Sequence, residues 1–151
     1  MEKVGEEQAC RWTLIDTLLP KDTNPAGDIF GGVLMSLMDK AAAVIAWRHV
    51  RQEVVTAGAE GIAFLRPVRV GEVVKVRARI VCTGRTSLEL AVTVEAENVF
   101  TGESQLAARG FFTMVALDET GRPTPVPQWE PRDDEERQLR DESLARRAKR
   151  G

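Results

Sequence analysis

Asp39 is the residue of this chain whose position most needs a chemical explanation. It lies in the middle of an apolar run, residues 29–47, and the adjacent Lys40 would point elsewhere on a helix, so Lys40 is not its partner. A carboxylate in such surroundings must be paired, hydrogen-bonded or neutralised. Two interpretations follow: a structural acid that bonds a backbone group of the sheet, or a desolvated general base that faces a cleft.

Two adjacent glycines, Gly31 and Gly32, stand where the helix that contains Asp39 should begin. A glycine inside a helix costs about 1 kcal/mol relative to alanine. In the first helical turn the backbone N–H groups have no intrahelical partners, and without side chains these donors stay open to an approaching oxygen. That arrangement is typical of an oxyanion hole. Close packing of this turn against a strand would explain the glycines equally well.

The distance between the glycines and Asp39 limits how they could cooperate. Residues 29 to 39 span about 15 Å of helix at a rise of about 1.5 Å per residue. Asn24, in the preceding loop, and the glycine donors therefore cannot meet the Asp39 of their own chain at one reacting atom. If they form one site, they do so across a two-fold axis, with the start of one helix facing the middle of its partner's. A working site then predicts a homodimer.

The elements that would position these residues follow from the spacing of apolar residues. Residues 21–28 are rich in Asp, Asn, Pro and Gly and predict a loop. A helix is predicted over residues 28–48, with Asp28 as its N-cap and apolar residues on nearly every side. Strands are predicted at residues 12–19, 54–65, 72–82, 86–98 and 106–117. Long antiparallel strands after one apolar helix favour the α+β class, with a curved sheet wrapped around the helix.

Length, charge and residue counts limit the class of protein. The chain has 151 residues, a net charge of −2 and a pI of about 5.6, which predicts one domain and gives no basic excess for nucleic-acid binding. No signal peptide is expected, and a central Asp39 is costly in lipid, so we expect a cytoplasmic protein without a membrane partner. The single histidine, His49, excludes a multi-histidine metal site. Neither a metal nor a cofactor is expected.

Three segments together resemble the hotdog-fold acyl-CoA thioesterases: DTNPAGDIFGGVLMSLMD, VVTAGAEGIAFLRPVRVGE and GRTSLELAVTVE, in this order and at matching intervals. The resemblance implies a hotdog domain over residues 12–127, with a long central helix wrapped by about five antiparallel strands. It also implies homodimers that often associate as trimers of dimers. Residues 1–11 would be a flexible N-terminus. Residues 128–151 would be a charged C-terminal helical tail, solvated because it has few apolar residues to bury.

The resemblance implies a reaction and assigns residues to it. The reaction is hydrolysis of an acyl-CoA thioester, a step of fatty acid metabolism, in which coenzyme A is part of the substrate rather than a cofactor. The family's general base falls on Asp39, its loop asparagine on Asn24, and the N–H that polarises the thioester carbonyl on Gly31 or Gly32. A thiol leaving group, with a pKa of about 8.5, departs without a strong general acid. Direct attack by water and an anhydride on Asp39 both remain open.

A basic stretch offers groups for the phosphates of coenzyme A. The family's nucleotide-binding segment falls on Gly84, Arg85, Thr86 and Ser87, in a turn, and Arg66 is a second candidate. Other basic residues of this stretch alternate with apolar ones and are predicted to form ion pairs with acids of the next strand; they are Lys75, Arg77 and Arg79, facing Glu89 and Glu95.

Other residues and other functions are less well supported by the pattern. His49, at the helix end, is interpreted as a C-terminal cap and Cys82 as structural, while Cys10 and Cys82 give no disulfide framework. A hotdog module that senses acyl-CoA without turnover is the alternative function, but such regulators would be expected to carry a helix-turn-helix and have less need of Asp39. A hotdog dehydratase would need a catalytic histidine in or beside the central helix, and His49 lies too late.

Overall fold

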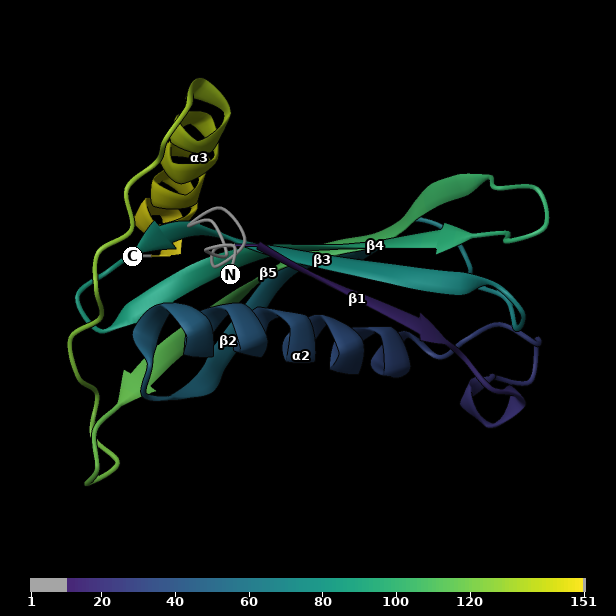
Figure 1. Ribbon diagram of the computed structural model, residues 1–151, viewed down its shortest axis with the longest axis horizontal. Coiled ribbons are helices and arrows are strands. Elements are labelled where there is room, and N and C mark those ends of the chain that lie inside the picture. The colour runs from purple at the N-terminus through teal and green to yellow at the C-terminus, as the bar shows by residue number, and fades with distance from the viewer. Residues whose placement is uncertain (1–10, 151) are drawn as a thin grey trace, which may run out of the picture.

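The computed structural model describes residues 11–150 and confirms the α+β class (Figure 1). Every predicted strand and both predicted helices are present, and the ends of the strands and of the central helix are shifted by up to three residues. In chain order the elements are β1 Arg11–Thr17, the short 3-10 helix η1 Pro20–Asp22, α2 Gly31–Val50, β2 Glu53–Phe64, β3 Val73–Thr83, β4 Ser87–Glu97, β5 Ser104–Leu117 and α3 Asp134–Arg150. The predicted flexible N-terminus and Cys10 lie outside the described residues, except for Arg11 in β1.

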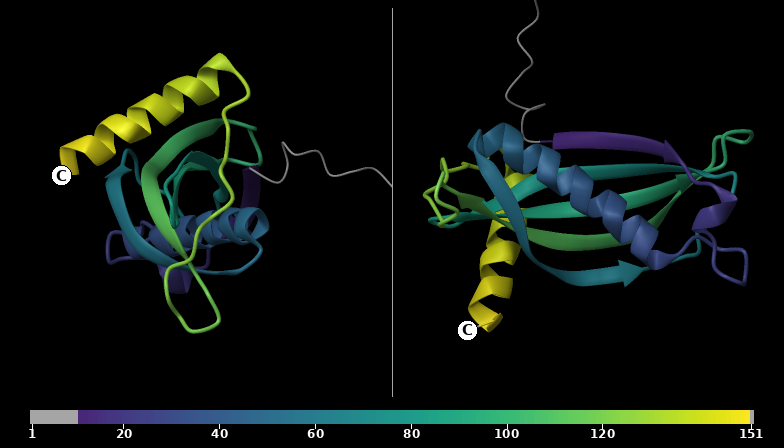
Figure 2. Two further views of the ribbon diagram at one scale, coloured as in Figure 1. Left: turned by 90° about the vertical axis from the view of Figure 1, so that its left-hand side faces the viewer. Right: turned by 90° about the horizontal axis from the view of Figure 1, so that it is seen from below.

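The five strands form one antiparallel sheet in the order β1-β3-β4-β5-β2. The sheet curves around α2, which lies along its concave face (Figures 1 and 2). Along α2, Met38, Ala41, Ala42 and Ile45 are fully buried, as the apolar pattern predicted. This is the hotdog fold, and its core is the space between the central helix and the inner face of the sheet.

Both predicted caps of α2 are wrong. The helix begins after Phe30, which makes no side-chain cap, while the backbone N–H and C=O of Asp28 are used by Asn24 within the loop. At the other end Arg51 adopts the left-handed conformation (φ 58°) and its N–H donates to the carbonyl of Trp47. His49 instead lies 2.6 Å, through Nε2, from the carbonyl oxygen of Pro127. It therefore ties the helix end to the segment that follows the sheet.

α3 lies on the convex face of the sheet, opposite α2 (Figure 2). The predicted helix is confirmed and most of its residues are exposed, as predicted, but the face toward the sheet buries polar side chains. Ser143 is fully buried and donates a hydrogen bond to the buried carboxylate of Glu89 on β4. Arg146 reaches the same carboxylate at 3.4 Å and places its guanidinium 3.5 Å from the centroid of the Phe111 ring.

The predicted ion pairs across the sheet form only in part. Arg77 on β3 pairs with Glu95 on β4 at 2.8 Å, as predicted. Glu89, however, is held by α3 instead of by the neighbouring strand, and Arg79 extends to Glu135 and Glu136 of α3. The sequence pattern placed these charges on the correct face of the sheet. It gave no sign that a helix would cover that face.

Glu136 is a second buried acid of this interface, 2% exposed. Burial alone would raise its pKa. That effect is outweighed by hydrogen bonds from the backbone N–H and the guanidinium of Arg132 and by the charges of Arg132 and Arg79, so the pKa of Glu136 is lowered. We call the set Glu89, Glu136, Ser143 and Arg146 the α3 network.

Candidate active site

Asn24 shapes the loop that leads into α2. Its side-chain oxygen accepts hydrogen bonds from the N–H groups of Ala26 (2.9 Å) and Asp28 (3.1 Å), which fixes which side-chain atom is the oxygen. The amide nitrogen of Asn24 donates to no other described residue. It is therefore available to an oxygen of a ligand, while the rest of the side chain holds the loop in place.

The two glycines at the start of α2 differ in their surroundings. A Cβ at Gly31 would lie 3.0 Å from the Phe64 ring, so close packing against β2 explains a glycine there. A Cβ at Gly32 would meet nothing within 4 Å, so packing does not explain the second glycine. Neither N–H group donates to another described residue, as the first turn of a helix predicts. The donor interpretation is therefore better supported at Gly32 than at Gly31.

A cleft of about 390 Å³ opens beside this helix start. Its lining brings Asn24 and Gly31 together with Arg66 on the segment after β2. Arg66 is already engaged there, because it pairs with Glu72 at 3.1 Å and donates to Gln105 at 2.8 Å. Its charge is therefore partly neutralised, which makes it a weaker phosphate ligand than the sequence suggested. Asp39 does not line this cleft.

Asp39 is half-buried and is held by a residue that the sequence interpretation missed. The hydroxyl of Thr56, on β2, donates to Asp39 Oδ1 at 2.6 Å. The structural alternative expected a bond from a backbone group of the sheet, whereas the bond comes from a side-chain hydroxyl of the sheet. The second carboxylate oxygen, Oδ2, accepts no hydrogen bond from the residues described. Thr56 is the third residue of VVTAGAEG, in one of the segments that carry the family resemblance.

The sheet register separates the two groups of candidate residues. Through β5, Thr56 lies level with Leu88 on β4, whereas Phe64, which contacts Gly31, lies level with Val94. Leu88 and Val94 are six residues apart on one strand, which corresponds to about 20 Å. The structure thus keeps the Asp39–Thr56 pair well apart from the helix start of the same chain. The sheet register therefore agrees with the helix rise in separating the two groups of residues within one chain.

The predicted nucleotide-binding turn joins β3 to β4. It is a tight turn in which the N–H of Gly84 donates to the carbonyl of Ser87 at 2.8 Å. Arg85 is exposed, and Thr86 and Ser87 are half-buried. Because Leu88 follows directly, this turn lies at the same end of the sheet as the Asp39–Thr56 pair.

Comparison with known proteins identifies the family. Residues 26–100 match the thioesterase superfamily. An uncharacterized acyl-CoA thioester hydrolase of Bacillus subtilis, YkhA, is 40% identical over 129 residues, which cover 85% of this chain and 75% of that protein. This chain belongs to the hotdog-fold acyl-CoA thioesterases. The cytosolic acyl coenzyme A thioester hydrolase of Rattus norvegicus is 36% identical over 136 residues, and this chain spans only 36% of its length.

Solved structures of this thioesterase family match over nearly the whole chain. An apo-hexameric acyl-CoA thioesterase is 40% identical and superposes with a TM-score of 0.90, over 95% of this chain and 92% of that one. An acyl-CoA hydrolase from Staphylococcus aureus, in complex with butyryl coenzyme A, coenzyme A and coenzyme A disulfide, is 33% identical with a TM-score of 0.87, over 95% and 87% of the two chains. It has also been characterised as three alanine variants, at an asparagine, an aspartate 15 residues later and a threonine 17 residues beyond that.

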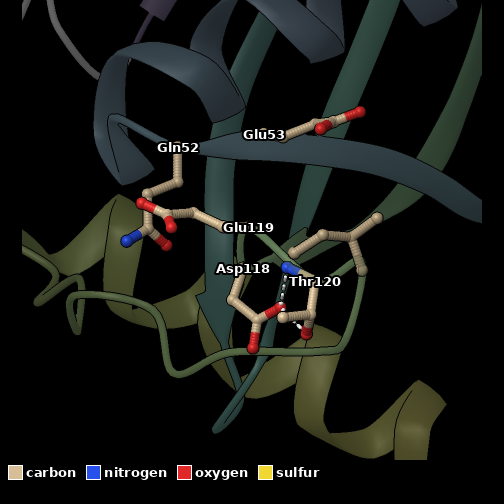
Figure 3. Close-up of a pocket in the computed structure, with 6 residues that line it drawn as sticks. Gln52, Glu53, Asp118, Glu119 and Thr120 are labelled. Atoms are coloured by element: carbon tan, nitrogen blue, oxygen red, sulfur yellow. Dashed lines mark hydrogen bonds between the residues drawn. The ribbon is translucent and has the colours of Figure 1, made fainter.

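A larger cleft, of about 540 Å³, lies elsewhere on the thioesterase and is lined by acids (Figure 3). Glu53, Asp118 and Glu119 contribute carboxylates, which would repel the phosphates of coenzyme A. The carboxylate of Asp118 is already engaged within its own turn. It accepts hydrogen bonds from the hydroxyl of Thr120 and from the N–H groups of Arg122 and Thr120, and these bonds hold the pKa of Asp118 below the usual value. Although this cleft is the larger of the two, its acidic lining does not suit a substrate that carries phosphates.

Two further properties concern residues 11–150 of the thioesterase. No group of three or more His, Cys, Asp or Glu side chains is placed to hold a metal ion. Neither described long helix has the length and apolar character that crossing a bilayer requires.

Proposed function

We propose that this chain hydrolyses acyl-CoA thioesters to the free acid and coenzyme A, with Asp39 as general base. Asn24 and an N–H of Gly31 or Gly32, contributed by the partner subunit, would polarise the thioester. The observation that carries the proposal is the Thr56–Asp39 hydrogen bond of 2.6 Å, which orients a half-buried carboxylate and leaves its second oxygen without a described partner.

The spacing of the three polar residues supports this assignment. Asn24, Asp39 and Thr56 are separated by 15 and 17 residues. The asparagine, aspartate and threonine replaced in the Staphylococcus aureus hydrolase have the same intervals. Of the three, Thr56 entered the candidate site only through the contact with Asp39, so the agreement does not depend on the family resemblance alone.

The chemical steps follow from the geometry of these groups. Asp39 Oδ2 accepts a proton from water as the water oxygen attacks the thioester carbon. The charge that develops on the carbonyl oxygen is stabilised by the N–H groups at the start of α2 of the partner subunit, with Asn24 beside them. The C–S bond then breaks, and the thiolate of coenzyme A leaves and takes up a proton. An anhydride at Asp39, opened later by water, would use the same groups.

The functional unit would be a homodimer. Each chain supplies an Asp39–Thr56 pair to one site and a helix start to the other, because about 20 Å of sheet separates them. β2 is one of the two edge strands of the sheet, and most of its residues are exposed, so it offers a surface on which a second copy can pair. The hexameric relatives support a trimer of dimers. We further propose a cytoplasmic location and a role in fatty acid metabolism.

Subunit mixing tests this arrangement. Asp39→Asn and Asn24→Ala are each purified, then denatured and refolded together in equal amounts, and thiol release from a panel of short, medium, long and aromatic acyl-CoAs is measured. Half of the dimers are then mixed, and each mixed dimer contains one intact site if the site is shared. The mixture should therefore recover about a quarter of the wild-type rate. Refolded wild type and each variant refolded alone are the controls.

Two results would contradict the proposal. A mixture that is no more active than the average of the two variants would show that Asp39 and Asn24 act within one chain or not at all. Wild-type protein that binds acyl-CoA and releases no thiol from any member of the panel would instead support the non-catalytic sensing module.

A further inference from the structure

A guanidinium group from α3 lies over the turn between β3 and β4. A Cβ built at Gly84 would come within 2.7 Å of Arg147 Nη2 and within 2.9 Å of Ser87 Oγ. Arg147 Nη1 also lies 3.5 Å from the Sγ of the buried Cys82. Gly84 is thus needed for the close approach of Arg147 to the turn.

The turn presents hydrogen-bond donors rather than acceptors. The segment after β5 occupies its carbonyl groups: Val126 N–H donates to Arg85 O, and the side chain of Gln128 donates to Gly84 O, each at 2.9 Å. In contrast, the backbone N–H groups of Arg85 and Thr86 donate to no described residue. The hydroxyl of Thr86 likewise has no described partner. What remains available at this turn is suited to an anion.

Two positive charges at the turn have no acidic partner in the part of the chain that the structure describes. Neither Arg85 nor Arg147 has a carboxylate within 4.0 Å among residues 11–150. The preceding residue of the helix is the contrast: Arg146 contacts Glu89, approaches Glu60 at 3.9 Å and covers Phe111. Adjacent arginines of one helix therefore have different roles. Arg146 fastens α3 to the sheet, and Arg147 carries its charge over the turn without an acidic partner among the described residues.

The family resemblance already assigns the turn of Gly84 to Ser87 to the nucleotide. We propose that Arg147 binds the phosphate groups of coenzyme A beside this turn, so that α3 forms part of the substrate site. This inference rests on the proposed function and extends it to a helix outside the sheet and central helix that carry the chemistry. A planar guanidinium binds phosphate oxygens in a bidentate manner, and the N–H groups of the turn supply further donors. The enzyme would in this way distinguish coenzyme A thioesters from thioesters that lack the nucleotide.

The position of the turn agrees with this assignment. It lies at the same end of the sheet as the Asp39–Thr56 pair. Leu88 lies level with Thr56 across the sheet, and it directly follows Ser87, the last residue of the turn. Two strand spacings, about 10 Å, separate β2 from β4 at that level. The phosphate site and the general base of one chain would therefore serve the same substrate molecule.

The test compares two substrates that differ only in the 3′-phospho-ADP portion, which carries all the phosphates of coenzyme A. Thiol release is measured with an acyl-CoA and with the matching acyl-pantetheine, for wild type, Arg147→Gln, Arg147→Lys and Lys149→Gln. Arg147→Gln should raise KM for the acyl-CoA about tenfold, leave kcat within about twofold, and leave both constants for the acyl-pantetheine unchanged. Arg147→Lys should recover part of the loss. Lys149→Gln, the loss of an exposed charge on the same helix, should behave as wild type and controls for net charge.

Three results would overturn the inference. The first is an unchanged KM for acyl-CoA in Arg147→Gln while wild type remains active and dependent on Asp39, which would leave the proposed function intact. The second is an equal loss with both substrates, which would show that Arg147 only supports the fold. The third uses adenosine 3′,5′-bisphosphate as a probe: it should compete with acyl-CoA, and if it instead changes the turnover of acyl-pantetheine, the turn binds a regulatory nucleotide rather than the substrate.

Discussion

α2 and α3 pack on opposite faces of one sheet and use opposite kinds of side chain (Figure 2). α2 buries Leu, Met, Ile and Ala along its length and contains one acid, Asp39, whose only described hydrogen bond is to Thr56. α3 has few apolar residues, and Glu136 and Ser143 account for part of what it buries. The apolar helix is held by packing that needs no charge, so the acid within it is not required for packing. The polar helix depends on its charges for its position.

The comparison separates two roles for a buried carboxylate. Glu89 and Glu136 each accept hydrogen bonds from groups of α3 or of the segment that precedes it. These bonds help to hold α3 on the sheet. Asp39 is held at one oxygen and open at the other. We therefore expect substitutions at Asp39 to affect catalysis and substitutions in the α3 network to affect stability.

The largest expected effect is that of Asp39→Asn on catalysis. The amide cannot accept a proton from water, so kcat should fall by about 10² to 10⁴-fold. Because the carboxamide can still accept the hydrogen bond from Thr56, the thermal unfolding midpoint should stay near that of wild type. Stopped thiol-release assays and calorimetry measure the two quantities. Activity within a few-fold of wild type would exclude Asp39 as the base.

The next largest effect is expected from Arg146→Ala, and on stability alone. The substitution removes the charge that faces the buried Glu89, and the free energy of unfolding should fall by about 2 kcal/mol. kcat at a temperature where the variant stays folded should be unchanged. Arg137→Ala is the control, because that exposed arginine pairs with the exposed Asp134 at the surface of the helix, and its loss should cost much less than that of Arg146. Equal losses in the two variants would show that the α3 network is no more important than a surface pair.

The two helices also differ in how far the sequence predicted them. The apolar pattern and the long strands gave α2, the sheet and the position of Asp39, because burial against the core leaves a periodic signal. α3 was predicted as a helix but not as a packed one. Its interface is made of charged and polar residues, and such residues have the same pattern whether they face water or another element.

A smaller effect is expected from Thr56→Val, which keeps the shape of the side chain and removes the hydroxyl. Asp39 would lose the hydrogen bond that orients it, and kcat should fall about tenfold with little change in KM. Thr56→Ser, which keeps the hydroxyl, should restore most of the rate. If Thr56→Ser is as slow as Thr56→Val, the methyl group rather than the hydroxyl is what matters at this position.

Thr56 also marks the limit of prediction at the site. Asp39 and the glycines are unusual within their own segments and could be found from the sequence, whereas Asn24 was found through the family resemblance. A threonine in a strand is ordinary, and only the contact with α2, seventeen residues away, gives it a role. The same holds for Arg147, whose place over Gly84 depends on how α3 packs.

The smallest effect is expected in acid and concerns Glu136. Its pKa in the folded protein is lowered from the ordinary value of 4.5, so the unfolded chain takes up a proton at a higher pH than the folded one does. The stability that Glu136 contributes is therefore fully present above about pH 5 and is lost as the pH falls through the folded pKa. Urea unfolding at several pH values should show a difference in free energy of unfolding between wild type and Glu136→Gln at pH 7 that shrinks toward pH 3. Glu142→Gln, at an exposed acid of the same helix, controls for the loss of charge. If the difference in free energy of unfolding between wild type and Glu136→Gln does not depend on pH, the side chain of Glu136 acts through packing. The charges of Arg132 and Arg79 would then not be what holds the first turn of α3 to the sheet.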